Sequence, residues 1–175
     1  ATRSQLNGAG VGPLVVAALR AFPTDVVVQF HGLNTICCLS ISPEDATSLG
    51  AADVAKAVVD AVHAFPRDQQ VQSRAWGVAA NLSLHHPVSL YLGSHGACEK
   101  VVAAMAAFPS DRDLQYSACQ LIFHFGAWLA PHHQYRNELA AAGGEAALKR
   151  LKSTFPRDDE LQAMASKALR RFGDA

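Results

Sequence analysis

The sequence predicts an all-α fold in which short helices stack as a solenoid, and three observations support this prediction. Phe-Pro pairs recur at residues 22–23, 65–66, 108–109 and 155–156, with spacings of 43, 43 and 47 residues. Asp follows each Phe by three residues, and Gln follows it by seven. Apolar or small residues follow at helical spacing, and periods of about 40–47 residues are typical of repeats built from two or three helices.

The first two helices of each unit are predicted by counting backward from its Phe. Twelve residues earlier stand Gly10, Gly96 and Gly143, with Asp53 in the second unit, and the glycines indicate a stop between two helices. A leucine four residues before this position marks a short first helix, and apolar residues seven and four before the Phe mark the second. The chain is therefore expected to hold four three-helix units, near 1–41, 42–84, 85–127 and 128–172, with the four extra residues of the last spacing at 128–131.

The third helix of each unit follows the Phe-Pro pair. Proline disfavours the α region in the residue before it, so each Phe is expected to end the second helix. The Asp two residues after the Pro is expected to cap the third helix, where its charge also suits the helix start. The apolar spacing then predicts third helices near 25–40, 68–84, 111–127 and 158–172. We expect the Gln to tie the turn together.

Composition and charge exclude several classes of protein. Half of the 175 residues are apolar and 17% are charged, which excludes a disordered chain. Fifteen Lys and Arg balance fifteen Asp and Glu, which argues against general electrostatic binding to nucleic acid or anionic lipid. Cys37, Cys38, Cys98 and Cys119 lie in apolar helical segments, so we expect a reducing soluble compartment, either the cytoplasm or an organelle interior. No apolar run is long enough to predict a membrane span.

A unit of a short helix, a Gly and two longer helices resembles the armadillo repeat, and the resemblance covers nearly the whole chain. The best stretch is Val71-Gln72-x-x-Ala75-x-x-x-Ala79-x-Asn81-Leu82-Ser83. The resemblance implies a right-handed α-solenoid, one domain over 1–175, whose third helices line a groove for protein partners. In the family a ladder of Trp and Asn binds extended peptides. In this chain the position of the family's Trp is occupied by Asn34, Gly77, Gln120 and Lys167. The position of its Asn is occupied by Cys38, Asn81, His124 and Arg171.

Only Asn81 agrees with the ladder, and Trp76 falls one place early, about 100° round the helix from the groove. We therefore expect this chain to share the family's architecture but not its specific peptide ligand. The candidate partner-binding residues of the groove are Asn34, Cys38, Arg74, Asn81, Gln120, His124, Trp128, Lys167 and Arg171.

The two end units differ in charge. The last unit has seven basic residues, which fit either a polar cap on the array or a patch for an acidic partner at Lys167 and Arg171. The first unit has an apolar second helix with little chain before it to cover an outer face. Either upstream sequence is missing, or another protein covers this end. The candidate end interface is Leu14, Val15, Val16 and Leu19.

No catalytic, cofactor or metal site is predicted. Gly8-x-Gly10-x-Gly12 lacks the strand that a phosphate-binding loop requires. The paired histidines 85–86 and 132–133 come without recognisable ligand spacing. Cys38 and His124 lie two repeats apart, too far for a nucleophile and its base. We expect a non-enzymatic scaffold or adaptor that binds protein partners, or alternatively a structural subunit of a larger assembly joined through its apolar first unit.

Overall fold

A computed structural model describes residues 2–41, 51–128 and 134–173, and within these ranges the chain is all-α. The described helices are α1 (Arg3–Gly8), α2 (Val11–Ala21), α3 (Val26–Leu39), α5 (Ala51–Ala64), α6 (Gln69–Leu82), α7 (His86–Ser94), α8 (Ala97–Ala107), α9 (Arg112–Trp128), α10 (Gln134–Ala141), α11 (Gly144–Thr154) and α12 (Asp159–Gly173). The all-α prediction is confirmed. The predicted first helix of the second unit around Leu49 and most of the insertion at 128–131 lie outside the described residues.

The third helices α3, α6, α9 and α12 begin and end within two residues of their predicted bounds, because the local signals act as expected. The side chain of Asp25 accepts hydrogen bonds from the backbone amides of Val27 and Val28, at 2.9 and 3.1 Å. The equivalent aspartates, Asp68, Asp111 and Asp158, each accept one from the amide three residues on, at 3.0 Å. Each Phe lies just beyond the second helix of its unit, as its Pro requires.

The repeated glutamine fastens the turn between the second and third helices. In every unit its Nε2 donates to two backbone carbonyls, ten and seven residues earlier; Gln115, for example, binds the carbonyls of Met105 and Phe108 at 2.8 and 3.1 Å. The same pair of bonds is made by Gln29, Gln72 and Gln162. These carbonyls belong to the end of the second helix, where intrahelical donors run out. The repeated Phe and Gln therefore mark the same hydrogen-bonded corner in each of the four units.

Three glycines separate the first helix of a unit from the second. Gly10, Gly96 and Gly143 have φ values of 76°, 77° and 83°, in the left-handed region that L side chains rarely adopt. Each stands immediately before the second helix of its unit. The predicted glycine stops are therefore sharp corners between two helices.

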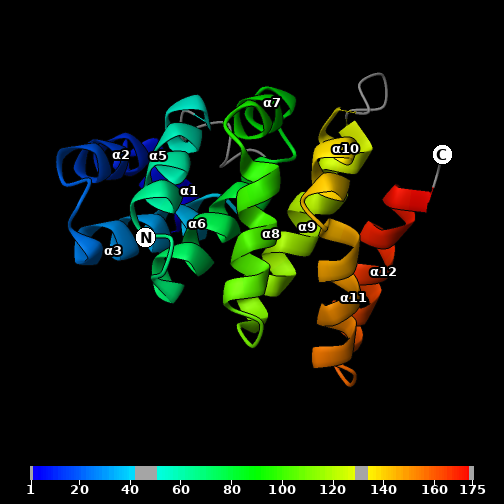
Figure 1. Cartoon of the computed structure of the whole chain (residues 1–175). Helices are drawn as coiled ribbons and strands as arrows, with labels where there is room; N and C mark the ends of the chain where they lie inside the picture. The colour runs from blue at the N-terminus through cyan, green and yellow to red at the C-terminus, as the bar shows by residue number, and fades with distance from the viewer. Residues whose placement is uncertain (1, 42–50, 129–133, 174–175) are drawn as a thin grey trace.

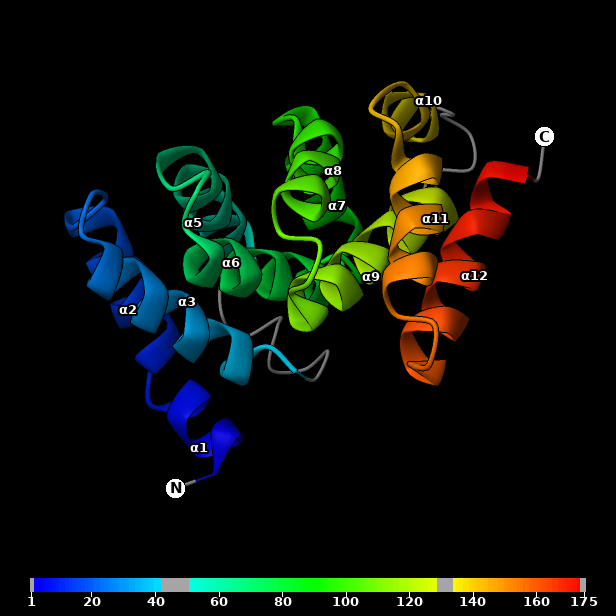
Figure 2. The ribbon, with the colours of Figure 1, turned by 60° about the horizontal axis from the view of Figure 1, so that its bottom comes forward.

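The units follow one another in chain order from one end of the molecule to the other (Figures 1 and 2). Along the third helices, α3 packs on α6, α6 on α9, and α9 on α12. The first and last units therefore lie at opposite ends. One core runs through the stack, with Trp76 and Phe125 its largest fully buried side chains. As expected, Trp76 turns inward, and its Nε1 donates to Oε1 of Gln72 at 2.9 Å.

Candidate protein-interaction surfaces

Four rows of partly exposed residues run across α3, α6, α9 and α12, and we call this surface the third-helix face. Its sixteen members occupy equivalent positions, 5, 9, 12 and 16 residues after the Phe of each unit. They are Val27, His31, Asn34 and Cys38 on α3; Gln70, Arg74, Gly77 and Asn81 on α6; Asp113, Ser117, Gln120 and His124 on α9; and Glu160, Met164, Lys167 and Arg171 on α12. None of the sixteen is buried, although the positions between them supply much of the core. The face is a continuous solvent-facing strip.

Asn81, the residue that matches the armadillo ladder, already makes side-chain hydrogen bonds within the chain. Its amide nitrogen donates to the carbonyl of Cys37 at 3.3 Å and to Oγ of Ser40 at 3.1 Å. These bonds join α6 to α3, so Asn81 fastens neighbouring units. Of the other predicted groove residues, Asn34 and Gln120 are half-buried and Cys38 is exposed. Trp128 is the last residue of α9, and its side chain lies outside the described part of the structure.

Arg74 borders a shallow cavity at the starts of α6 and α9. Its guanidinium lies 3.8 Å from the carboxylate of Asp113, while its Nε is buried without a hydrogen-bond partner. The cavity has a volume of about 390 Å³ and is lined by Phe30, Gln69, Gln70, Ser73, Arg74, Asp111, Arg112 and Asp113. Its walls carry both signs of charge, so the cavity has no strong preference for a cation or an anion.

His124 is held by a buried serine. Its Nδ1 lies 2.6 Å from Oγ of Ser83, whose single hydroxyl hydrogen is donated to the carbonyl of Ala80 at 2.7 Å. Burial lowers the pKa of His124, because the charged imidazolium loses its solvent. Ser83 is fully buried, so its hydroxyl has no room for an incoming substrate. The pair links α6 to α9 at the end of the third-helix face.

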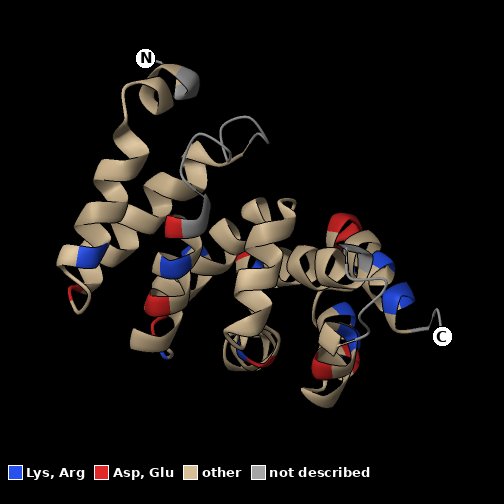
Figure 3. Cartoon of the chain, turned by 90° about the horizontal axis from the view of Figure 1, so that it is seen from above, with Lys and Arg blue, Asp and Glu red and all other residues tan. Residues whose placement is uncertain are grey.

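The basic residues of α12 are free of acidic partners in the described structure. Lys167 and Arg170 are exposed, and Arg171 extends over the ring of Phe123, with 4.7 Å from its guanidinium carbon to the ring centroid. Arg171 packs this closely because α9 carries Gly126 at the contact; a Cβ there would lie 2.7 Å from the Cβ of Arg171. Three acids of the same unit are engaged elsewhere, since Asp158 and Glu160 both bind Arg112 at 2.6 Å and Glu145 binds Lys149 at 2.6 Å. Asp159 is exposed at the opposite end of α12, in its first turn. Figure 3 shows charged positions along the whole array, with several Lys and Arg toward its C-terminal end.

The predicted end interface divides into exposed and buried residues. Leu14 is 70% exposed and Val15 is half-buried, but Val16 and Leu19 are 3% and 2% exposed. Val16 and Leu19 face the inside of the first unit, one helical turn apart, so including them in an exposed surface was wrong. Exposed apolar side chains on neighbouring segments extend the surface instead: Leu6, Phe22, Val26, Val27 and Ile41. Six of the eight large apolar side chains exposed in the described residues thus belong to the first unit.

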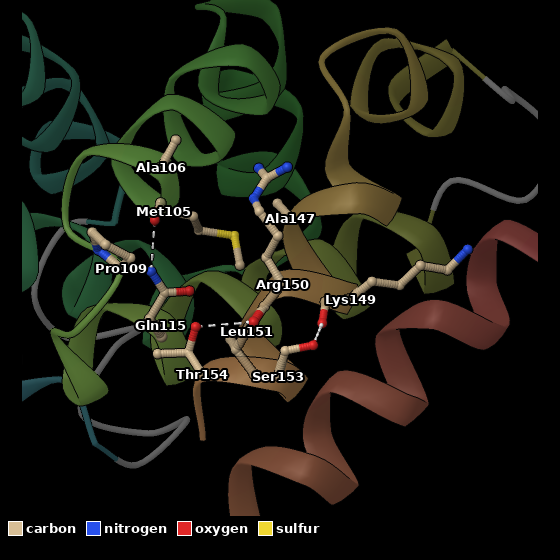
Figure 4. Close-up of a pocket in the computed structure, with 10 residues that line it drawn as sticks. All are labelled: Met105, Ala106, Pro109, Gln115, Ala147, Lys149, Arg150, Leu151, Ser153 and Thr154. Carbon is tan, nitrogen blue, oxygen red and sulfur yellow. Dashed lines mark hydrogen bonds between the residues drawn. The ribbon is translucent and has the colours of Figure 1, made fainter. Parts of the chain in front are cut away.

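A cleft between α8 and α11 carries residues that sequence reasoning did not select. Its volume is about 580 Å³, and its lining residues are Met105, Ala106, Pro109, Gln115, Ala147, Lys149, Arg150, Leu151, Ser153 and Thr154. Figure 4 shows Arg150 and Met105 beside each other over this cleft, with Lys149 extending away from it. The sequence pattern marks Leu151, four residues before its Phe, as a core position, whereas Met105 and Ala147 fall outside the marked positions. The gap between them arises only from the packing of two second helices.

Two of the cysteine thiols, those of Cys98 and Cys119, are buried. Burial raises the pKa of the Cys119 thiol to about 12. Burial, followed by the nearby carboxyl of Glu138, also raises the pKa of Cys98. Both thiols are therefore protonated at neutral pH and poor nucleophiles. Within the described ranges no three His, Cys, Asp or Glu side chains come together as metal ligands, and no helix has the length and apolar character to cross a bilayer. The histidines at 132–133 lie outside these ranges.

Comparison with models of known protein families gave no match, and a search of curated proteins gave no significantly similar sequence.

Proposed function

We propose that the chain is a right-handed, armadillo-like α-solenoid that acts as a non-enzymatic scaffold and binds an extended acidic segment of a protein partner along its third-helix face. The observation that carries the proposal is that sixteen equivalent positions across four helices all remain at least partly exposed. A surface that repeats in register suits a ligand that also repeats, and an extended peptide is such a ligand. Packed helices stand about 10 Å apart, which matches about three residues of extended chain per unit.

The charge of the face supports an acidic ligand at its C-terminal half. Lys167 and Arg171 lie on the face and Arg170 beside it, and none of the three is neutralised by a carboxylate among the described residues. The acids of the face, Asp113 and Glu160, stand at the opposite ends of their helices, in the first turn. An acidic segment that crosses the ends of α9 and α12 meets uncompensated cations and avoids these carboxylates.

The test uses a short, fluorescein-labelled peptide of alternating Glu and Ser, with binding followed by anisotropy at moderate ionic strength. Lys167→Glu is expected to weaken binding about tenfold, because it removes one attraction and adds a repulsion. Arg157→Glu is the matched control, since Arg157 is an exposed cation of the same unit that lies off the third-helix face. Equal losses of peptide affinity in both variants would show that the peptide responds only to the overall charge of the protein, and this result would refute the proposal.

A structural subunit of a larger assembly is the second candidate, and the exposed apolar surface of the first unit favours it. Leu14, Phe22, Val27 and Ile41 are 54% to 70% exposed, whereas Leu84 and Leu90, the exposed large apolar side chains described outside the first unit, reach 44% and 39%. Large exposed apolar patches mark interaction sites. Leu14→Asp leaves the core intact and is expected to relieve self-association of the purified chain, measured by light scattering over a wide concentration range.

Leu90→Asp is the control for this second candidate, because Leu90 is 39% exposed on α7, away from the first unit. A wild-type chain that scatters as an 18.6 kDa monomer at every concentration would count against the assembly subunit. Val16→Asp is not a suitable variant, since it would place a carboxylate in the core.

A further inference from the structure

We propose that the cleft between α8 and α11 is a second protein-binding site, which takes an apolar side chain and a neighbouring carboxylate from a partner's peptide, with Arg150 as the anion-binding residue. None of the residues of the third-helix face lines this cleft. The inference is therefore independent of the function proposed for that face.

The floor of the cleft is apolar. Met105, Ala147 and Leu151 are each 3% to 4% exposed and form its base, with Pro109 and Ala106 at the edge. A volume of about 580 Å³ is within the range of pockets that hold ligands, although this cleft opens to solvent along Ser153 and Thr154. An open apolar cleft suits an anchoring side chain of a larger molecule better than an enclosed small ligand.

Two polar groups at the cleft lack partners among the described residues. Arg150 is exposed, makes no side-chain hydrogen bond or ion pair, and extends over Met105 (Figure 4). Gln115 uses its Nε2 for the corner, and its Oε1 points toward the cleft without a donor. In the second unit the equivalent Gln72 Oε1 accepts from Trp76, but the third unit has Cys119 in the place of that Trp. The cleft therefore offers an unpaired guanidinium and a free amide oxygen, which fit a carboxylate and a peptide N–H.

The C-terminal ends of α8 and α11 meet at this cleft, and carbonyls near both ends accept hydrogen bonds from side chains. The carbonyls of Lys149 and Arg150 accept from Ser153 and Thr154, at 3.2 and 3.0 Å. The carbonyl of Met105 accepts from Gln115. Lys149 and Arg150, which both line the cleft, carry full positive charges, and these outweigh the partial negative charge of about half a unit at each helix C-terminus.

The repeat supplies an internal comparison. The equivalent cleft between α2 and α5 has a volume of about 280 Å³, about half that of the α8–α11 cleft. Asp60 stands there at the position of Arg150, and both of its oxygens bind Lys56, at 3.1 and 2.8 Å. The first cleft is thus smaller and its charges are satisfied within the chain. Of these two clefts, the α8–α11 cleft is the larger and has the unpaired charge.

The chain contains two methionines, and they report on the two proposed sites separately. Met105 lies in the cleft and Met164 on the third-helix face. Carbon-13 labelling of the methionine methyl groups therefore gives one NMR signal per site. The probes are three short blocked peptides, Gly-Ser-X-Asp-Glu-Ser-Gly, in which X is Leu, Met or Phe, each titrated to about 1 mM, the weakest affinity that counts as binding here.

A saturable shift of the Met105 signal with at least one peptide is the expected result. Arg150→Glu is expected to weaken this binding about tenfold, and Arg157→Glu to leave it within about twofold. Far-ultraviolet circular dichroism and the urea midpoint of unfolding must match those of the wild-type chain in both variants, which confirms that the fold is intact. No Met105 shift with any of the three peptides would overturn the proposal, as would equal losses in the two variants. A shift of Met164 alone would also overturn it and would instead support the third-helix face.

Discussion

Replacement of Gln72 by methionine removes one repeated corner bond without leaving a cavity. Gln72 is 2% exposed, and its amide makes three hydrogen bonds, to the carbonyls of Val62 and Phe65 and from Nε1 of Trp76, at 3.1, 3.0 and 2.9 Å. Methionine has a similar length and volume and nearly the same helix propensity. The loss of stability therefore reports the hydrogen bonds alone.

The expected magnitude comes from these three bonds. Each contributes about 1 kcal/mol net, and the buried carbonyls and indole N–H left behind gain no water in compensation, so the free energy of unfolding should fall by about 3 kcal/mol. With a urea dependence of about 2 kcal/mol per molar, the midpoint moves down by about 1.5 M. Gln162→Met should cost less, because Gln162 is only half-buried in the last unit and makes two such bonds.

Urea unfolding followed by both tryptophan fluorescence and far-ultraviolet circular dichroism measures the effect. Two probes are needed because repeat arrays can unfold in steps, and Trp76 reports mainly on the second unit. Gln70→Met is the matched control, since Gln70 lies exposed on the same helix and its side chain makes no hydrogen bond within the described structure. A loss of less than about 0.5 kcal/mol for Gln72→Met, or one equal to that of Gln70→Met, would refute the corner as a stabilising element.

Three further outcomes are expected. Ellman's reagent at pH about 8 should label Cys38 rapidly and Cys119 only after unfolding, because burial raises the pKa of Cys119 to about 12; rapid reaction of more than two thiols in the folded chain would contradict this. Gly96→Ala should lower the free energy of unfolding by about 1–2 kcal/mol, because φ is 77° there. A Cβ at this position would meet no atom within 4 Å, so the whole loss comes from the backbone conformation. An unchanged melting temperature would argue against a left-handed corner. The Arg112 guanidinium holds the pKa of Asp158 below its ordinary 3.8, so this pair stabilises the fold above that pH and stops doing so as pH falls through the lower, folded value. The stability difference between wild type and Arg112→Gln should therefore be constant near neutrality and vanish in acid, whereas a difference that persists in strong acid would point to packing.

The sequence by itself determined the helices and their corners. Proline before Asp, the Asp cap and the apolar period act over a few residues, so Asp25 and its equivalents locate the starts of the third helices without knowledge of the fold. The same period separates the exposed rows from the core and turns Trp76 inward. The role of the repeated Gln was also predictable, because its partners lie only ten and seven residues away in the chain.

Only the tertiary structure decided how the surfaces are used. Asn81 matches a ligand-binding position in sequence, but its amide binds Cys37 and Ser40 of the preceding unit, a contact some forty residues away. Val16 and Leu14 look alike in an apolar helix, and their burial differs because Val16 belongs to the core whereas Leu14 points away from it. The cleft beneath Arg150 arises between two second helices from different units. Local signals specify each helix, whereas exposure and cavities depend on the distance between helices, which side chains far apart in sequence set together.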